Sequence, residues 1–417
     1  MKKQIVTLWF VAALGGIAAM AAANEAKPVV KQVEGLTLYQ ALEMAESLQP
    51  ELAEAKAMVE AAEGRARQAG AFPNPDAVVR MELARFRDPT SQAELPVGIS
   101  QTVPLGSRLS KARQAEQLER ELRARGLEVK HRAIRKRVHS AFATALYQEK
   151  AYQAQTQTLK NTEKAVATTK ARVETGDALR EDLARVEMEL ARARVELQRA
   201  ESLHQQSLVA LASAIGEAAL SVKSLAGSLD VTFEIPTLES LAANLPVHPE
   251  IAMADTAVRA RNARVDLAKA ERIPDVKVDL LYRRLQASRE NTFDVGLSIP
   301  LPLFNRNQGR LREARAEVAA AEARTRMTQN ELTTRLRESH LQLTTALASS
   351  RTLKAEILEK ADTVLKGTEA RYAAGDISLA EILPVRRDWA AVQLSHLESL
   401  RDVMQAWAQV RSFAGPD

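Results

Sequence analysis

The chain has 417 residues, of which 46% are hydrophobic, 27% charged and only 4% aromatic, and its formal net charge is +5. Such a composition is typical of long helices or coiled coils and argues against a conventional globular core. The absence of cysteine excludes disulfides and thiolate metal ligands. Basic residues crowd 119–139, but the 53 acidic residues nearly match the 58 Lys and Arg, and that stretch lacks stacking aromatics. We therefore expect a solvated helix face or a partner contact there, and no nucleic-acid binding.

The N-terminus has the layout of a secretory signal. Lys2 and Lys3 precede an apolar run over residues 5–20, which ends in small residues before Asn24. This pattern predicts a cleaved signal peptide over residues 1–23 and export from the cytoplasm. An uncleaved anchor is the alternative, although the glycines and alanines of this run suit cleavage better. No other stretch approaches 18 apolar residues, so we expect any membrane contact of the mature chain to avoid α-helices.

Landmarks recur at a spacing of 198 or 199 residues along the chain. "QPELAEA" corresponds to "HPEIAMA", "VGISQTVPL" to "VGLSIPLPL", and "ETGDALREDL" to "AAGDISLAEI". A fixed spacing across separate anchors indicates a tandem duplication. The sequence thus predicts a first repeat over 24–216, a linker over 217–237 with a possible short strand at 231–235, and a second repeat over 238–417.

Each repeat is expected to contain a helix, two strands, a long helix and a further helix. In the first repeat these elements are predicted at 50–70, 76–86, 95–105, 107–173 and 178–215. In the second they are predicted at 249–272, 276–285, 293–303, 308–372 and 378–412. A helix of about 65 residues is about 100 Å long at ~1.5 Å per residue, which nearly matches the two shorter helices placed end to end. We therefore expect one long helix beside two stacked short ones, with heptad seams that pack as antiparallel coiled coils.

The turns between the last two helices of each repeat are marked by Gly-Asp pairs. Glycine readily adopts the left-handed conformation that ends a helix. Gly176 with Asp177, and Gly375 with Asp376, are accordingly predicted to form hairpin tips.

The predicted strands alternate between apolar and polar residues. In the third strand the apolar residues are Val276, Val278, Leu280 and Tyr282, between charged residues such as Asp279. Strands of about ten residues with one apolar face fit a transmembrane β-barrel, with a half-buried soluble sheet as the alternative. Four strands cannot close a barrel, and an open edge in hydrocarbon leaves backbone groups unpaired. Three copies sharing their strands would supply twelve.

The segments that link strand to helix are rich in proline, glycine and asparagine. Proline lacks the donor that a ladder needs, so within a sheet it belongs at an edge, a bulge or a strand end. We expect the chain to leave its sheet and become helical at these junctions, which are marked by Pro104, Gly106, Pro300, Pro302, Asn305, Asn307 and Gly309.

Several of these segments together resemble one family. They include "LTLYQALEMAESLQPEL", "SQTVPLGSR", "SIPLPLFNRNQGRLREARAE" and "RYAAGDISLAEIL". The chain resembles the outer membrane efflux proteins of the TolC type, and within them the heavy-metal branch typified by CzcC and CusC. The resemblance implies a mainly α chain with a small β part, whose homotrimer forms a 12-stranded β-barrel in the outer membrane above a periplasmic α-helical tube.

The resemblance also implies partners and a role. Such ducts passively export their cargo, here heavy-metal cations, and they couple to a periplasmic membrane-fusion adaptor protein and an inner-membrane pump of the resistance-nodulation-division class. The rival functions are a multidrug or type I secretion duct of the same fold and, from another class, a periplasmic coiled-coil adaptor or scaffold. Several relatives carry an acylated cysteine, which this chain lacks, so its anchoring would depend on the barrel alone.

Relatives narrow the periplasmic mouth with acidic rings, whose counterparts here are Asp182 and Glu381 by position from the tip glycines. The alternative for both residues is a solvated coiled-coil face, and Asp177 and Asp376 can equally be plain helix-terminus residues. No catalytic or cofactor motif appears, and the six histidines and nine methionines are dispersed. We expect no enzyme activity, no cofactor and no resident metal site.

Overall fold

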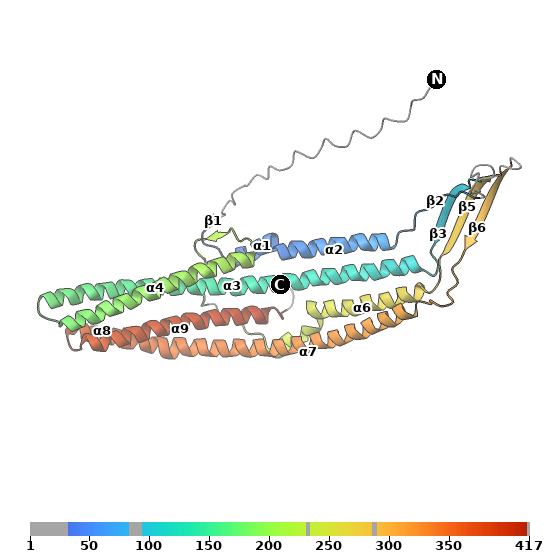
Figure 1. The fold of residues 1–417 in the computed structure, drawn as a ribbon. Helices are drawn as coiled ribbons and strands as arrows, with labels where there is room; N and C mark the ends of the chain where they lie inside the picture. The colour runs from blue at the N-terminus through green and yellow to red at the C-terminus, as the bar shows by residue number, and fades with distance from the viewer. Residues whose placement is uncertain (1–31, 83–93, 231–233, 286–289, 415–417) are drawn as a thin grey trace, which may run out of the picture.

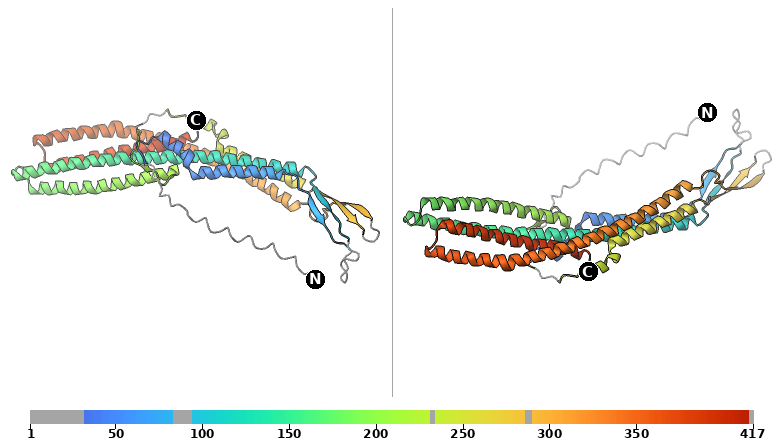
Figure 2. Two further views of the ribbon diagram at one scale, coloured as in Figure 1. Left: turned by 90° about the horizontal axis from the view of Figure 1, so that it is seen from above. Right: turned by 90° about the horizontal axis from the view of Figure 1, so that it is seen from below.

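The computed structural model describes residues 32–82, 94–230, 234–285 and 290–414. These residues form an elongated set of helices lying side by side, with a small sheet at one end and two helical turns at the other (Figure 1). The views from above and below show the same order of parts (Figure 2). The prediction of a mainly α chain with a small β part is confirmed. The predicted signal peptide lies outside the described residues, as do 83–86 of the first predicted strand and 231–233 of the possible linker strand.

The first repeat contains one long helix flanked by two shorter ones. Helix α3 covers Arg108–Glu174, against a predicted 107–173. Helix α2, Pro50–Ala69, packs beside the half of α3 nearer the sheet, and α4, Arg180–Ile215, packs beside the other half (Figure 1). Proline at the first position of α2 suits a helix start because the first amide has no acceptor within the helix.

The second repeat follows the same plan. Helix α6 covers Pro249–Ala270 and α9 covers Leu379–Arg411, and both pack against α7, Gln308–Thr352. The long helix predicted as a single element over 308–372 is not purely α. A π-helical segment, η2 over Leu353–Leu358, separates α7 from α8, Glu359–Ala374. A π turn widens the hydrogen-bond ring without needing proline or glycine, so the apolar periodicity of the sequence does not reveal it.

The four longer strands form one antiparallel sheet in the order β2-β3-β5-β6. The strands are β2 Asp76–Val79, β3 Val97–Val103, β5 Val276–Arg284 and β6 Asn291–Ser298. The prediction that the last strand continues to 303 is wrong, because the ladder stops before the two prolines that cannot donate to it. Strand β2 ends at Val79, with one further bridge between Glu82 and Glu94.

Several small elements near the middle of the molecule were not predicted. Helix α1, Leu38–Leu48, precedes α2, and α5, Leu238–Ala243, with a 3₁₀ turn η1, Leu245–Val247, precedes α6. Two short strands, β1 Gln32–Val33 and β4 Ser221–Val222, pair in parallel. The predicted linker therefore joins the start of the described chain to the middle of the helical body.

Two apolar clusters hold this middle region together. The larger one centres on Ile134, Phe142 and Leu146 of α3, which pack against Leu211 and Ile215 of α4. The smaller one joins α5, α7 and α9 through residues such as Leu241, Leu336 and Val410. Full burial of each large apolar side chain contributes about 1.5–3 kcal/mol. In the described part of the chain, no helix combines the length and hydropathy needed to cross a membrane.

Candidate functional site at the two ends of the fold

The two hairpin tips lie at the end of the molecule opposite the sheet (Figure 1). Gly176 and Gly375 have φ values of 84° and 83°, in the left-handed region that glycine adopts without strain. The amide of Asp177 donates to the Arg172 carbonyl at 2.7 Å, and that of Asp376 donates to the Arg371 carbonyl at 2.9 Å. Both tips therefore end their helices in the same six-to-one turn.

The side chain of Asp177 makes a contact within its own turn. The Thr175 hydroxyl donates to the Asp177 carboxylate at 2.8 Å, so this carboxylate stabilises its own turn. This contact supports the helix-terminus interpretation for Asp177.

Asp182 lies in the first turn of α4, where a carboxylate is favoured by the helix dipole. Its side chain is 26% exposed and lies 3.9 Å from Nη1 of Arg185, a long contact. The carboxylate is thus only partly neutralised within one chain.

Glu381 has a defined local partner. Its carboxylate accepts from the backbone amide of Ser378 at 3.1 Å and from the Ser378 hydroxyl at 2.9 Å, which completes a capping box at the start of α9. These hydrogen bonds, the backbone one first, lower the pKa of Glu381. The residue is exposed, so it stays charged and helix-capping at neutral pH. Sequence reasoning missed this role, although Ser378 three residues before Glu381 is its signature.

A small apolar cluster joins the two hairpins near their tips. Val186 of α4 packs with Leu379 and Ile382 of α9. Beside it, the carboxylate of Glu189 lies 3.8 Å from Nε of Arg387 on the other hairpin. Asp182 and Glu381 therefore lie at equivalent positions on two hairpins that are packed together.

At the opposite end of the molecule, residues in the left-handed backbone conformation connect each strand to the helix that follows it. Gly106 has a φ of 64°, and a Cβ there would lie 2.6 Å from Cδ1 of Ile273. Ser107 and Asn307 precede α3 and α7 with φ values of 60° and 57°. Asparagine tolerates this region, and Nδ2 of Asn307 donates to the Ala268 carbonyl at 2.9 Å, which ties the junction to α6.

The remaining junction residues lie around these turns. Pro104 follows β3, while Pro300 and Pro302 lie between β6 and α7, outside the ladder. The Asn305 side chain accepts from the Asn307 amide at 3.1 Å. Gly309 lies inside α7 with open space around it, so the conformation there does not require glycine. An ion pair of 2.6 Å between Arg108 and Asp275 links the start of α3 to the segment between α6 and β5.

One face of the sheet is apolar and exposed. Rows of paired residues cross β3, β5 and β6, such as Ile99, Leu280 and Val295, of which Val295 is 77% exposed. Val97, Tyr282 and Phe293 form the next row, with the two rings 5.6 Å apart. A contiguous apolar surface of this kind marks an interaction with lipid or protein.

The other face of the sheet is polar. Arg283 reaches three carboxylates, those of Glu82 and Glu94 at 2.9 Å and that of Asp294 at 2.7 Å. Closer to the helices, Ser100 is fully buried beside Asp279, its partner in the ladder. The alternation predicted from the sequence thus separates an apolar from a charged face.

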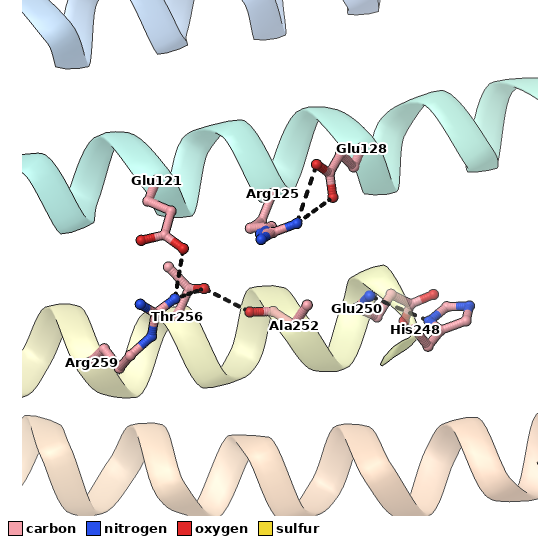
Figure 3. A network of polar contacts seen from close by, with 8 residues as sticks. All are labelled: Glu121, Arg125, Glu128, His248, Glu250, Ala252, Thr256 and Arg259. Carbon is pink, nitrogen blue, oxygen red and sulfur yellow. Dashed lines mark hydrogen bonds and ion pairs between the residues drawn. The ribbon is translucent and has the colours of Figure 1, made fainter. Parts of the chain in front are cut away.

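Polar contacts also link the long helices between the two ends. Figure 3 shows Arg259 of α6 donating to Glu121 of α3 at 2.7 Å, and to the Thr256 hydroxyl at 2.8 Å. Among the described residues, no group of three or more histidine, aspartate or glutamate side chains is placed to hold a metal ion.

Comparison with known proteins gives the family. The family model described as "Outer membrane efflux protein" matches residues 41–217 and 242–416. The chain belongs to the outer membrane efflux protein family. The family model matches this efflux protein in two segments, and the predicted resemblance to the family is confirmed.

One curated relative and one solved structure match most of the efflux protein, and a second relative matches part of it. It is 27% identical over 380 residues to the cobalt-zinc-cadmium resistance protein CzcC of Cupriavidus metallidurans, which covers 91% of this chain and 90% of CzcC. It is 32% identical over 98 residues to the nickel and cobalt resistance protein CnrC of the same organism, covering 22% and 23% of the two chains. The solved structure of CusC superimposes with a TM-score of 0.77 at 16% identity, covering 91% of this chain and 92% of CusC. The fold is therefore that of TolC-like outer-membrane channels.

Proposed function

We propose that this efflux protein is the outer-membrane channel component of a tripartite efflux system of the resistance-nodulation-division type, and that it passively exports heavy-metal cations. In this proposal residues 1–23 direct export and are removed. Three copies then assemble into one duct, with a 12-stranded barrel in the outer membrane and a helical tube across the periplasm.

The exposed apolar face of the four-stranded sheet carries the proposal. Val295, Leu297 and Phe293 of β6 are each at least 68% exposed in the single chain. Among the described strands, β2 and β6 each pair on one side only. Unpaired backbone groups cost several kcal/mol each in hydrocarbon, so a lipid-facing sheet of four strands requires neighbouring copies to close it. The charged face around Arg283 would then line the water-filled bore.

Heavy-metal cations are the proposed cargo because the relative matched over nearly its full length is a cobalt-zinc-cadmium resistance protein. A passive duct needs a wet and weakly binding bore, because tight coordination would slow release. Selection of the ion is then a task for the adaptor and the pump.

The helical tips are the proposed contacts with adaptor and pump, and Asp182 and Glu381 are the proposed gate. Three copies of each carboxylate around a narrow mouth would attract cations and repel one another. The turns at Gly176 with Asp177 and at Gly375 with Asp376 would be the outermost points of the duct.

Deletion of the gene tests the cargo. We expect higher intracellular zinc, cobalt, cadmium or copper under metal challenge, restored by the gene in trans. Unchanged metal tolerance together with increased drug sensitivity would instead support a multidrug duct, and a soluble periplasmic pool of the protein would support the adaptor or scaffold.

Bilayer recordings test the gate. Asp182→Asn combined with Glu381→Gln removes both charges, while glutamine keeps the capping box because it also accepts from the amide of Ser378. We expect a lower preference for cations over anions. Glu181→Gln is the matched control, since Glu181 is exposed in the same turn of α4. Wild-type selectivity in the double variant would reject the gate.

A further inference from the structure

A cavity of about 380 Å³ lies at mid-length, where α9 ends beside α3 and beneath α1. In Figure 1 the end of α9 faces the beginning of α6 along the length of α3. The cavity falls within the size range of small-molecule sites. Its lining is mainly basic and includes Glu128, His131, Arg132, Arg135, Lys136, His139 and Arg411.

The basic side chains come mostly from one face of α3. Residues spaced four apart on a helix lie above one another, so His131, Arg135 and His139 form one row and Arg132 and Lys136 the next. Glu128, the carboxylate in the lining, is held by Arg125 at 3.1 Å (Figure 3). Arg135 pairs with Glu46 of α1 at 3.0 Å. Lys136 is therefore the lining cation that a bound anion could pair with.

Two of these basic groups lack a partner. Lys136 makes no ion pair or hydrogen bond with any described residue. His139 is 8% exposed, and its Nδ1 is buried without a hydrogen-bond partner in the described structure. A buried polar atom without a partner is costly, so its retention needs an explanation such as a bound group. Burial first, and then the positive charge of Arg411, lower the pKa of His139 to about 4, so its ring is neutral at neutral pH.

A second opening borders the first. A cavity of about 230 Å³ between α3 and α7 shares Arg132, Lys136 and Ser412 with it. Arg132 is committed to the fold, since its guanidinium donates to the Ser412 carbonyl at 2.9 Å. Lys136 thus stands between two cavities with its ammonium group available.

The duplicated halves differ at this point. In the first repeat, α4 ends against the start of α2 with no space, since Gln49 donates to the Ala214 carbonyl at 2.9 Å and a Cβ on Gly216 would lie 2.7 Å from Cα of Gln49. The sequences differ too. Residues 130–139 hold five Lys and Arg, two histidines and no acid, whereas residues 329–338 hold two arginines and two glutamates. Repeat architecture alone therefore does not account for the basic cavity.

We propose that this cavity binds a small anion that carries phosphate or carboxylate groups, with Lys136 and His139 as its direct contacts. The ammonium group of Lys136 pairs with the anion, and the ring of His139 donates its one N–H to it. This site is separate from the tips and from the sheet, and it does not depend on which cargo the duct exports.

Calorimetric titration of the full protein in detergent tests the site, with inorganic phosphate in one arm and citrate in the other at constant ionic strength. We expect saturable binding of at least one anion, and the arm that binds identifies phosphate or carboxylate as the preferred group. Lys136→Gln should weaken binding on the order of tenfold or more, as expected for loss of a charged hydrogen bond. His139→Gln is the second variant and should weaken it several-fold.

The matched control is Lys160→Gln, which removes the same charge from an exposed position of α3 away from the cavity. It should bind as the wild type does. The proposal is overturned if neither anion binds saturably, or if the Lys136 and His139 variants bind as tightly as the control.

Discussion

The close approach of two strands at Gly98 allows a sharp test of the sheet. A Cβ at this position would lie against the carbonyl oxygen of Leu280 and 2.7 Å from Cα of Leu281. Both atoms belong to the backbone of β5, so they cannot move aside as a flexible side chain would. Overpacking of this kind costs about 1–3 kcal/mol, and the backbone contact places Gly98→Ala at the upper end, about 3 kcal/mol.

Gly296 is the matched control in the same sheet. A Cβ there would lie 3.4 Å from Cβ of Asp279, an ordinary contact. Alanine restricts the unfolded chain more than glycine does, so Gly296→Ala should be neutral or stabilising by about 0.5 kcal/mol. The urea midpoint in detergent and the yield in the outer-membrane fraction measure both variants. Equal urea midpoints and equal yields for the two variants would refute the register of β3 against β5.

Three further results are expected. Glu381→Ala should speed hydrogen exchange of the backbone amides in the first turn of α9, because the capping box is lost. Glu381→Gln should leave this exchange near the wild-type rate. Equal exchange rates in both variants would contradict the capping role. His139 has a folded pKa of about 4 against an ordinary 6.5, so the unfolded chain binds a proton that the folded chain does not between these values. Stability should therefore fall as the pH drops from 6.5 to 4, by roughly 3 kcal/mol, and His139→Gln should flatten this slope in urea titrations. Arg283→Gln should lower the urea midpoint, because three carboxylates lose the cation that they share. Arg284→Gln is the control, since Arg284 is not part of this cluster, and it should leave the midpoint unchanged. Equal midpoints for the two variants would argue against the network.

The long elements could be predicted because their signals are local and repeated. Gly176 and Gly375 end their helices in the left-handed conformation, as the Gly-Asp pairs indicate. The prolines at 300 and 302 lie after the ladder for the reason that the sequence suggests, although the strand ends earlier than predicted.

The elements that were missed depend on contacts far apart in the chain. Strands β1 and β4 have two residues each and pair across 189 positions, so neither carries a recognisable alternation. The basic cavity is equally hidden, since it needs the end of α9 to meet the middle of α3. Its basic residues on α3 looked like a solvated helix face because periodicity does not reveal which helix face is covered.

The central claim, that three chains share their strands to close one barrel, is tested most directly by cross-linking the sheet edges. The chain has no cysteine, so Val79→Cys on β2 can be combined with a cysteine replacing Phe293, Val295 or Leu297 on β6. Within one chain these edges are three strand spacings apart, about 14 Å, too far for a disulfide. We predict that at least one pair yields covalent species that stop at three chains on oxidation in the outer membrane. Covalent species that stop at two chains, continue beyond three or never form with any pair would contradict the claim.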